Sequence, residues 1–254
     1  MLSNQKLFSV GNFDFRLQHL LIIGILSLAF SISILLRSTP MSYGDELFEY
    51  DTFFNFRATE YLVNNSVEDY FQWHDEKSWH PFGRNVSDTS QVTLHLTTAI
   101  LYQIFNFGMS LYDFTILFPL VIGSLTAVAV FGFVRVLGGT TAGLFASLMF
   151  AVSIPIVIRG FAGWFKSEPL GLFFGFLALY LFVSGIKYNK GKISFLKLIG
   201  GAIFLALALS AWGGMLFFVL AIILFIFALP FIKNDKNFLI WSIPVFSITF
   251  ILAS

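Results

Sequence analysis

The sequence contains no cysteine, which excludes disulfide bonds and thiol-based catalysis but leaves the redox compartment open. Charged residues are scarce as well: they make up 11% of the 254 residues, against about 25% in soluble domains, while 57% are hydrophobic. The net charge is only +1, and the basic residues lie in short clusters between apolar runs, so no nucleic-acid partner is expected. This composition predicts an all-α, polytopic membrane helical bundle.

Apolar runs follow one another along most of the chain, and a span of the hydrocarbon core needs about 20 residues. We predict about seven spans, at residues 17–36, 114–137, 141–158, 169–186, 196–211, 215–231 and 238–254. An eighth run, 91–107, is shorter and contains His95 and Gln103. We therefore expect this run to form an interfacial or re-entrant helix.

Basic residues predict the orientation of the bundle. Lys6 and Arg16 precede the first span, which places the N-terminus in the cytoplasm. If the run 91–107 does not cross the membrane, three basic regions lie on the cytoplasmic side: the Lys-rich loop 187–197, the loop 233–236 and Arg135. The remaining loops, 38–113 and 159–168, are then external. We expect the first to contain short helices lying near the membrane surface.

Acidic residues are concentrated in the first external loop, where ten of the fourteen lie between Asp45 and Asp88. Four of these, Asp45, Glu46, Glu49 and Asp51, stand among aromatic residues in the segment 44–57. The second external loop adds the charged residues Arg159, Lys166 and Glu168. Carboxylates that converge at one membrane face suit a hard cation such as Mg²⁺ or Mn²⁺, although the spacing alone is a weak signal.

Simpler interpretations compete with a metal site. Asp51 is a suitable N-cap for a helix starting at Thr52, and the residues alone favour that interpretation. Glu168, followed by Pro169, suits a helix N-terminus. The histidines lack metal-ligand spacing, so we expect interfacial hydrogen bonds from them: His74, His80 and His95.

Four stretches, in order, resemble the catalytic subunit of oligosaccharyltransferase, a membrane enzyme that moves a lipid-linked oligosaccharide to asparagine. FEYDTFFNFRATEYLVNN (48–65) is similar to the first acidic motif of that family and the helix after it. WHDEKSWHPFGR (73–84) is similar to the following loop signature. RGFAGWFKSEPLG (159–171) resembles the second external loop, and SAWGG (210–214) resembles a later turn.

The resemblance implies a set of site residues. Asp51 would bind Mn²⁺ or Mg²⁺ and engage the amide of the acceptor asparagine. The second loop of the family offers a D-x-E-like pair; its trailing carboxylate is present as Glu168, but Lys166 stands where the leading aspartate is expected. Substrate-binding roles are expected of Glu49, Arg57, Arg84 and Arg159. The implied partners are a lipid-linked oligosaccharide, an acceptor polypeptide with an N-x-S/T sequon, and membrane lipid.

The family also carries a later glutamate loop and a soluble C-terminal domain with a W-W-D-Y-G motif. The sequence reaches Ser254 before either, so we expect the chain by itself to be incomplete and inactive. One alternative is a non-catalytic paralogue that binds lipid-linked glycan or a partner subunit, because Lys166 places a cation where a metal ligand is expected. Another is a different polyprenyl-phosphate glycosyltransferase, against which the matches at 79–84 and 212–214 argue.

Overall fold

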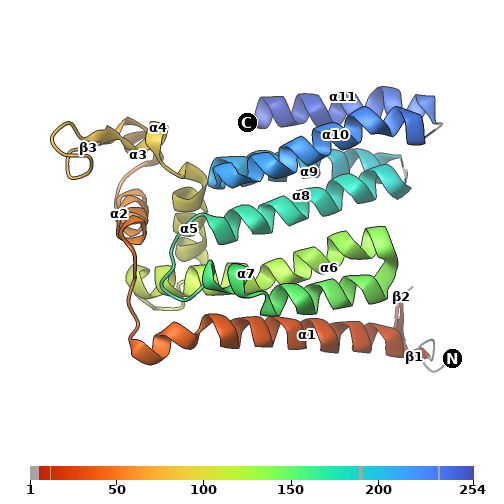
Figure 1. Ribbon diagram of the computed structural model, residues 1–254, viewed down its shortest axis with the longest axis horizontal. Coiled ribbons are helices and arrows are strands. Elements are labelled where there is room, and N and C mark those ends of the chain that lie inside the picture. The colour runs from red at the N-terminus through yellow and green to blue at the C-terminus, as the bar shows by residue number, and fades with distance from the viewer. Residues whose placement is uncertain (1–5, 12, 189–190, 234) are drawn as a thin grey trace.

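The computed structural model describes residues 6–11, 13–188, 191–233 and 235–254, which form a bundle of long helices (Figure 1). The long helices are α1 (Leu17–Arg37), α6 (Leu111–Val152), α8 (Glu168–Tyr188), α9 (Lys192–Ala211), α10 (Leu216–Ile232) and α11 (Lys236–Ala253). These six are long and apolar enough to cross a membrane. The predicted all-α polytopic bundle is confirmed.

Shorter elements complete the described part of the chain. The short helices are η2 (Thr39–Tyr43), α2 (Tyr50–Asn64), α3 (Val67–Gln72), α4 (Val86–Thr89), α5 (Val92–Phe105), α7 (Ile154–Ile158) and η3 (Gly213–Met215). Two small antiparallel hairpins, which we did not predict, pair β1 (Lys6–Val10) with β2 (Phe13–Arg16) and β3 (His74–Asp75) with β4 (Arg84–Asn85).

Helix α6 contains two of the predicted spans. As one straight rod, its 42 residues would extend about 63 Å, twice the hydrocarbon thickness of about 30 Å. Gly139 interrupts the helix with φ 88° and ψ 177°, a conformation that glycine adopts without steric cost. The chain doubles back at this point (Figure 1). The predicted span 141–158 is too long, because α6 ends at Val152 and residues 154–158 form the separate helix α7.

Small residues bring α8 and α9 into close contact. A Cβ atom on Gly201 would lie 3.1 Å from the backbone nitrogen of Phe182 and 3.3 Å from the backbone oxygen of Ala178. Such close approach is typical of helices that pack inside a membrane. By contrast, α10 leaves large apolar side chains exposed, among them Phe217, Leu224 and Phe231. An exposed apolar face of this kind suits contact with lipid.

The predicted external segments lie at one end of the bundle. Figure 1 shows α2, α3, α4, α5 and the segment before α8 at the left end, whereas β1, β2 and the bend of α6 lie at the right end. Helix α5, at 14 residues, is not among the six candidate spans, as expected for the run 91–107. The predicted loops 187–197 and 233–236 include residues 189, 190 and 234, which lie outside the described residues.

Which end of the bundle faces the cytoplasm stays a prediction, and single-cysteine labelling tests it because the chain has no native cysteine. Glu68 in α3 and Lys192, the first residue of α9, are both exposed, and Figure 1 shows α3 at one end of the bundle and the start of α9 at the other. A membrane-impermeant maleimide should label Glu68→Cys from outside intact cells and Lys192→Cys only after permeabilisation. Labelling of both positions from the same side would contradict the predicted orientation.

Candidate functional site

The acidic segment 44–57 includes the start of α2. Glu49 is the N-cap of this helix, and its Oε2 accepts a hydrogen bond from the backbone nitrogen of Asp51 at 3.1 Å. The interpretation of Asp51 as the N-cap is therefore wrong. Asp51 lies in the first helical turn, and its side chain is 68% exposed. Glu49 has φ 83°, a strained conformation for a residue with a side chain, and such strain is often found at functional sites.

The second external loop docks on the first through its backbone. Gly163 donates its N–H to the carbonyl of Ile116 at 2.9 Å and accepts a hydrogen bond from the N–H of Phe48 at 3.3 Å. Gly163 has φ 81°, and a Cβ atom here would lie 2.2 Å from the carbonyl oxygen of Glu46. Only glycine allows the two loops to approach this closely.

This docking places Lys166 against the acidic segment. Its Nζ lies 2.9 Å from Oδ2 of Asp51 and 3.0 Å from Oε2 of Glu49. The Lys166 side chain is only 17% exposed. Burial by itself would lower the pKa of Lys166, but the hydrogen bonds to Asp51 and Glu49 outweigh it and raise the pKa. Lys166 therefore carries its full positive charge at neutral pH.

Glu168 forms a separate ion pair at the start of α8, where the sequence predicted a helix N-terminus. Its Oε1 accepts a hydrogen bond from Nη1 of Arg159 at 3.1 Å, while its Oε2 is buried without a hydrogen-bond partner among the described residues. Arg159 and Lys166 both lie over the ring of Trp164, at 5.2 Å and 5.3 Å from its centroid. Both cations therefore contact the same indole ring.

The two predicted metal ligands, Asp51 and Glu168, each contact a cationic side chain in this arrangement. Within the described residues, no three His, Cys, Asp or Glu side chains are grouped so that they could hold a metal ion. Asp51 directs Oδ2 to Lys166, and Glu168 directs Oε1 to Arg159. A divalent cation needs several oxygen ligands, and the buried Oε2 of Glu168 supplies just one of them.

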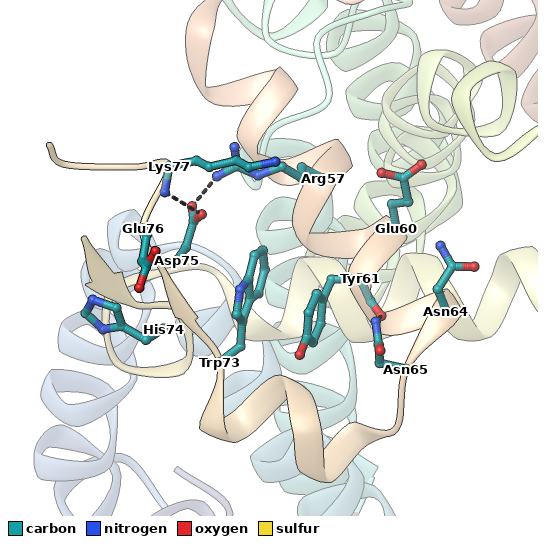
Figure 2. Close-up of a pocket in the computed structure, with 10 residues that line it drawn as sticks. All are labelled: Arg57, Glu60, Tyr61, Asn64, Asn65, Trp73, His74, Asp75, Glu76 and Lys77. Atoms are coloured by element: carbon teal, nitrogen blue, oxygen red, sulfur yellow. Dashed lines mark hydrogen bonds and ion pairs between the residues drawn. The ribbon is translucent and has the colours of Figure 1, made fainter.

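Two arginines that we predicted to bind substrate, Arg57 and Arg84, also contact neighbouring side chains of the chain. Arg57 forms an ion pair with Asp75 and donates a hydrogen bond to Ser78 at 3.0 Å. Figure 2 shows Arg57 pointing from α2 toward Asp75, at the rim of an open cavity of about 480 Å³. The guanidinium of Arg84 stacks 3.5 Å from the ring centroid of Phe54. Both contacts tie the β3–β4 hairpin to α2.

A buried polar chain, which the sequence analysis missed, holds the second loop in place. Asn55 donates from Nδ2 to the carbonyl of Phe165 at 2.9 Å, next to Lys166. His95 Nε2 lies 3.1 Å from Oδ1 of Asn55, and His95 Nδ1 lies 2.6 Å from the hydroxyl of Tyr70. Because Asn55 Oδ1 is an acceptor only, His95 carries its proton on Nε2 and accepts from Tyr70.

The sequence contains one signal for this chain of buried hydrogen bonds. Asn55 follows Asp51 by four residues, so the two side chains share one face of α2. His95 forms hydrogen bonds, as expected, but it is completely buried rather than interfacial. No spacing rule predicts a hydrogen bond between α5 and α2.

The family model described as "Oligosaccharyl transferase STT3, N-terminal" matches residues 19–254. The chain belongs to the STT3 oligosaccharyl transferase family. Its relatives include the STT3B subunit of the dolichyl-diphosphooligosaccharide–protein glycosyltransferase of Arabidopsis thaliana, 28% identical over 214 residues. The STT3 subunit of Saccharomyces cerevisiae is 31% identical over 185 residues. These alignments cover 83% and 71% of this chain, but 29% and 25% of the relatives.

The fold is also that of an oligosaccharyltransferase of known structure. The oligosaccharyltransferase AglB of Archaeoglobus fulgidus, in complex with an inhibitory peptide and a dolichol-phosphate, aligns with a TM-score of 0.76 and 19% identity. The alignment covers 93% of this chain and 29% of that chain. The STT3 membrane fold therefore accounts for nearly the whole chain, which spans less than a third of the length of these relatives.

The close approach at Gly163 should be essential for docking of the second loop. Gly163→Ala introduces both a positive-φ alanine and a clash with Glu46, so we expect a clear fall in the thermal unfolding midpoint in detergent. Gly108→Ala is the matched control, because Gly108 has φ 84° but nothing within 4 Å of an added Cβ atom. Equal destabilisation by both substitutions would show that backbone strain alone, rather than the docking contact, matters.

Burial of His95 should make stability depend on pH. Burial lowers the pKa of His95 to about 3 from its ordinary value of 6.5. The unfolded chain therefore takes up a proton near pH 6.5 and the folded chain does so only near pH 3, so stability falls as the pH falls through this window. Between pH 7 and pH 4.5 the loss should be on the order of 2 kcal/mol.

Thermal unfolding at the two pH values tests this prediction. His95→Gln should remove most of the pH-dependent loss, although it lowers stability at pH 7, whereas His80→Gln, at an exposed histidine, should leave the loss unchanged. A pH-dependent loss of the same size in His95→Gln would assign it to other groups.

Proposed function

We propose that this chain is the membrane part of an oligosaccharyl transferase. The complete enzyme would transfer a glycan from a polyprenyl-phosphate or polyprenyl-pyrophosphate carrier to the asparagine side chain of an N-x-S/T sequon. The N-terminus would face the cytoplasm, and the loops 38–113 and 159–168 would lie outside, in a cell membrane or an endoplasmic-reticulum membrane.

The observation that carries this proposal is the convergence of the two external loops at Asp51. Asp51 and Lys166 are more than a hundred positions apart in the sequence, yet their side chains are in contact at 2.9 Å. The partners of relatives support the same substrates. One solved Archaeoglobus fulgidus structure contains an inhibitory peptide and a dolichol-phosphate, and another carries a tethered acceptor peptide with an NVT sequon.

The exposed carboxylate of Asp51 suits an amide nucleophile. An amide nitrogen is a poor nucleophile because its lone pair is delocalised into the carbonyl group. Asp51 would accept a hydrogen bond from the acceptor N–H and polarise the amide. A bond then forms between the amide nitrogen and the anomeric carbon, the bond from that carbon to the phosphate oxygen breaks, and the proton released by the amide nitrogen passes to the Asp51 carboxylate.

The leaving phosphate carries the developing negative charge. Arg159, at the same end of the bundle, is 53% exposed and would offer a planar guanidinium to the phosphate oxygens. Glu168 would hold this guanidinium in place through its 3.1 Å contact. Binding of Mn²⁺ or Mg²⁺ by Asp51 and Glu168 stays a prediction, and no step described here depends on it.

One observation favours a second function. Lys166 and Arg159 already neutralise the carboxylates that the family resemblance assigns to metal binding. A non-catalytic paralogue would retain the fold and bind lipid-linked glycan or a partner subunit without transferring the sugar. Transfer of the glycan and binding of lipid-linked glycan both require a site for a polyprenyl phosphate, so binding is the first property to measure.

Native mass spectrometry of the chain in detergent, titrated with a polyprenyl phosphate, tests the proposal. We expect saturable binding that Arg159→Gln weakens at least about tenfold, because the phosphate loses a bidentate cationic partner. Lys192→Gln is the matched control: it removes one exposed positive charge at the opposite end of the bundle and should leave binding unchanged. Equal weakening by both variants would indicate non-specific attraction and would overturn the proposed site.

A further inference from the structure

We propose that the Lys166 ammonium is the resident cation of this site, where it takes the position that the family resemblance assigns to a divalent metal ion. The inference rests on the proposed function, because it concerns the same external site. It predicts a site in which the protein itself supplies the cation, held by a covalent tether rather than taken from solution.

The geometry of Lys166 is that of a cation bound by two carboxylates. Its Nζ lies 2.9 Å from Asp51 and 3.0 Å from Glu49, within the range of charge-assisted hydrogen bonds. The two carboxylates come from the N-cap and the first turn of α2, and like charges so close together repel unless a cation lies between them. Glu49 keeps its strained φ of 83° in this arrangement.

The backbone around Lys166 fixes the ammonium in this position. The N–H of Lys166 donates to the carbonyl of Trp164 at 2.8 Å, and the preceding carbonyl, of Phe165, accepts from Asn55 at 2.9 Å. Phe165 is fully buried against Phe118. The backbone of Lys166 is therefore held from both sides, so ordering the ammonium between the carboxylates costs rotamer freedom of the side chain but no further backbone freedom.

Charge explains why Lys166 and a metal ion exclude each other. A protonated ammonium has no lone pair, so it cannot act as a ligand, and it repels a divalent cation at the distance of a shared carboxylate. The other predicted metal ligand, Glu168, is paired with Arg159 at 3.1 Å. A metal ion would have to displace a tethered cation from one predicted ligand and compete with a second cation at the other.

Titration of Mn²⁺ against the whole chain in detergent, followed by the electron paramagnetic resonance signal of free Mn²⁺, tests the inference. Lys166→Asp replaces the cation by a third carboxylate beside Asp51 and Glu49, so it should bind one Mn²⁺ at least about tenfold more tightly than the unmodified chain. Lys192→Asp makes the same change of charge at the opposite end and should bind Mn²⁺ no more tightly than the unmodified chain.

Two further measurements keep the test decisive. Mn²⁺ should raise the thermal unfolding midpoint of Lys166→Asp but leave that of the unmodified chain unchanged, since a ligand stabilises only the state that binds it. In the unmodified background, Asp51→Asn should not alter Mn²⁺ affinity. This last comparison needs no variant at position 166, so it remains informative if Lys166→Asp does not fold.

Two results would overturn the inference. The first is tight Mn²⁺ binding by the unmodified chain that Asp51→Asn abolishes. The second is a Lys166→Asp variant that folds but binds Mn²⁺ no better than Lys192→Asp. The Mn²⁺ titration and the unfolding measurement use no lipid-linked substrate. A negative result in them is therefore distinct from a negative result in the polyprenyl-phosphate titration.

Discussion

Backbone hydrogen bonds around Gly163 hold the two external loops together, and the candidate site depends on them. Gly163 bonds to Phe48 in the first loop and to Ile116 in the first arm of α6, while the neighbouring Ala162 donates to the carbonyl of Arg37 at the end of α1. Buried peptide groups need partners of this kind, because an unsatisfied group is costly away from water. The need of buried peptide groups for hydrogen-bond partners thus positions the loops as well as the helices.

Charge compensation then determines which side chains remain available at the site. Lys166 neutralises Asp51 and Glu49, and Arg159 neutralises one oxygen of Glu168. Arg57 is similarly paired with Asp75, away from these groups. Pairing is favoured where aromatic rings and the membrane reduce solvent screening, because the Coulomb interaction strengthens as the effective dielectric constant falls. Among these paired groups, the Asp51 and Arg159 side chains remain 68% and 53% exposed.

The helices were predictable because their signal is local. A run of about 20 apolar residues specifies a candidate span without reference to any other part of the chain. The predicted run 114–137 lies within α6, and the run 169–186 lies within α8. The errors occurred where the local signal is ambiguous: residues 154–158 form a separate short helix, and Glu49 rather than Asp51 caps α2. A cap depends on which of two nearby carboxylates reaches a free N–H, which composition does not reveal.

By itself, the sequence determined that this is a helical membrane bundle with its polar chemistry in one acidic segment, and its motifs indicated the family. Only the tertiary structure decided that Lys166 contacts both Asp51 and Glu49, that Glu168 pairs with Arg159, and that His95 is buried against Asn55. Hydropathy depends on each residue and its immediate neighbours. Contacts between residues more than a hundred positions apart, such as Asp51 and Lys166, depend on how the helices between the two loops pack, because that packing sets the distance between the loops.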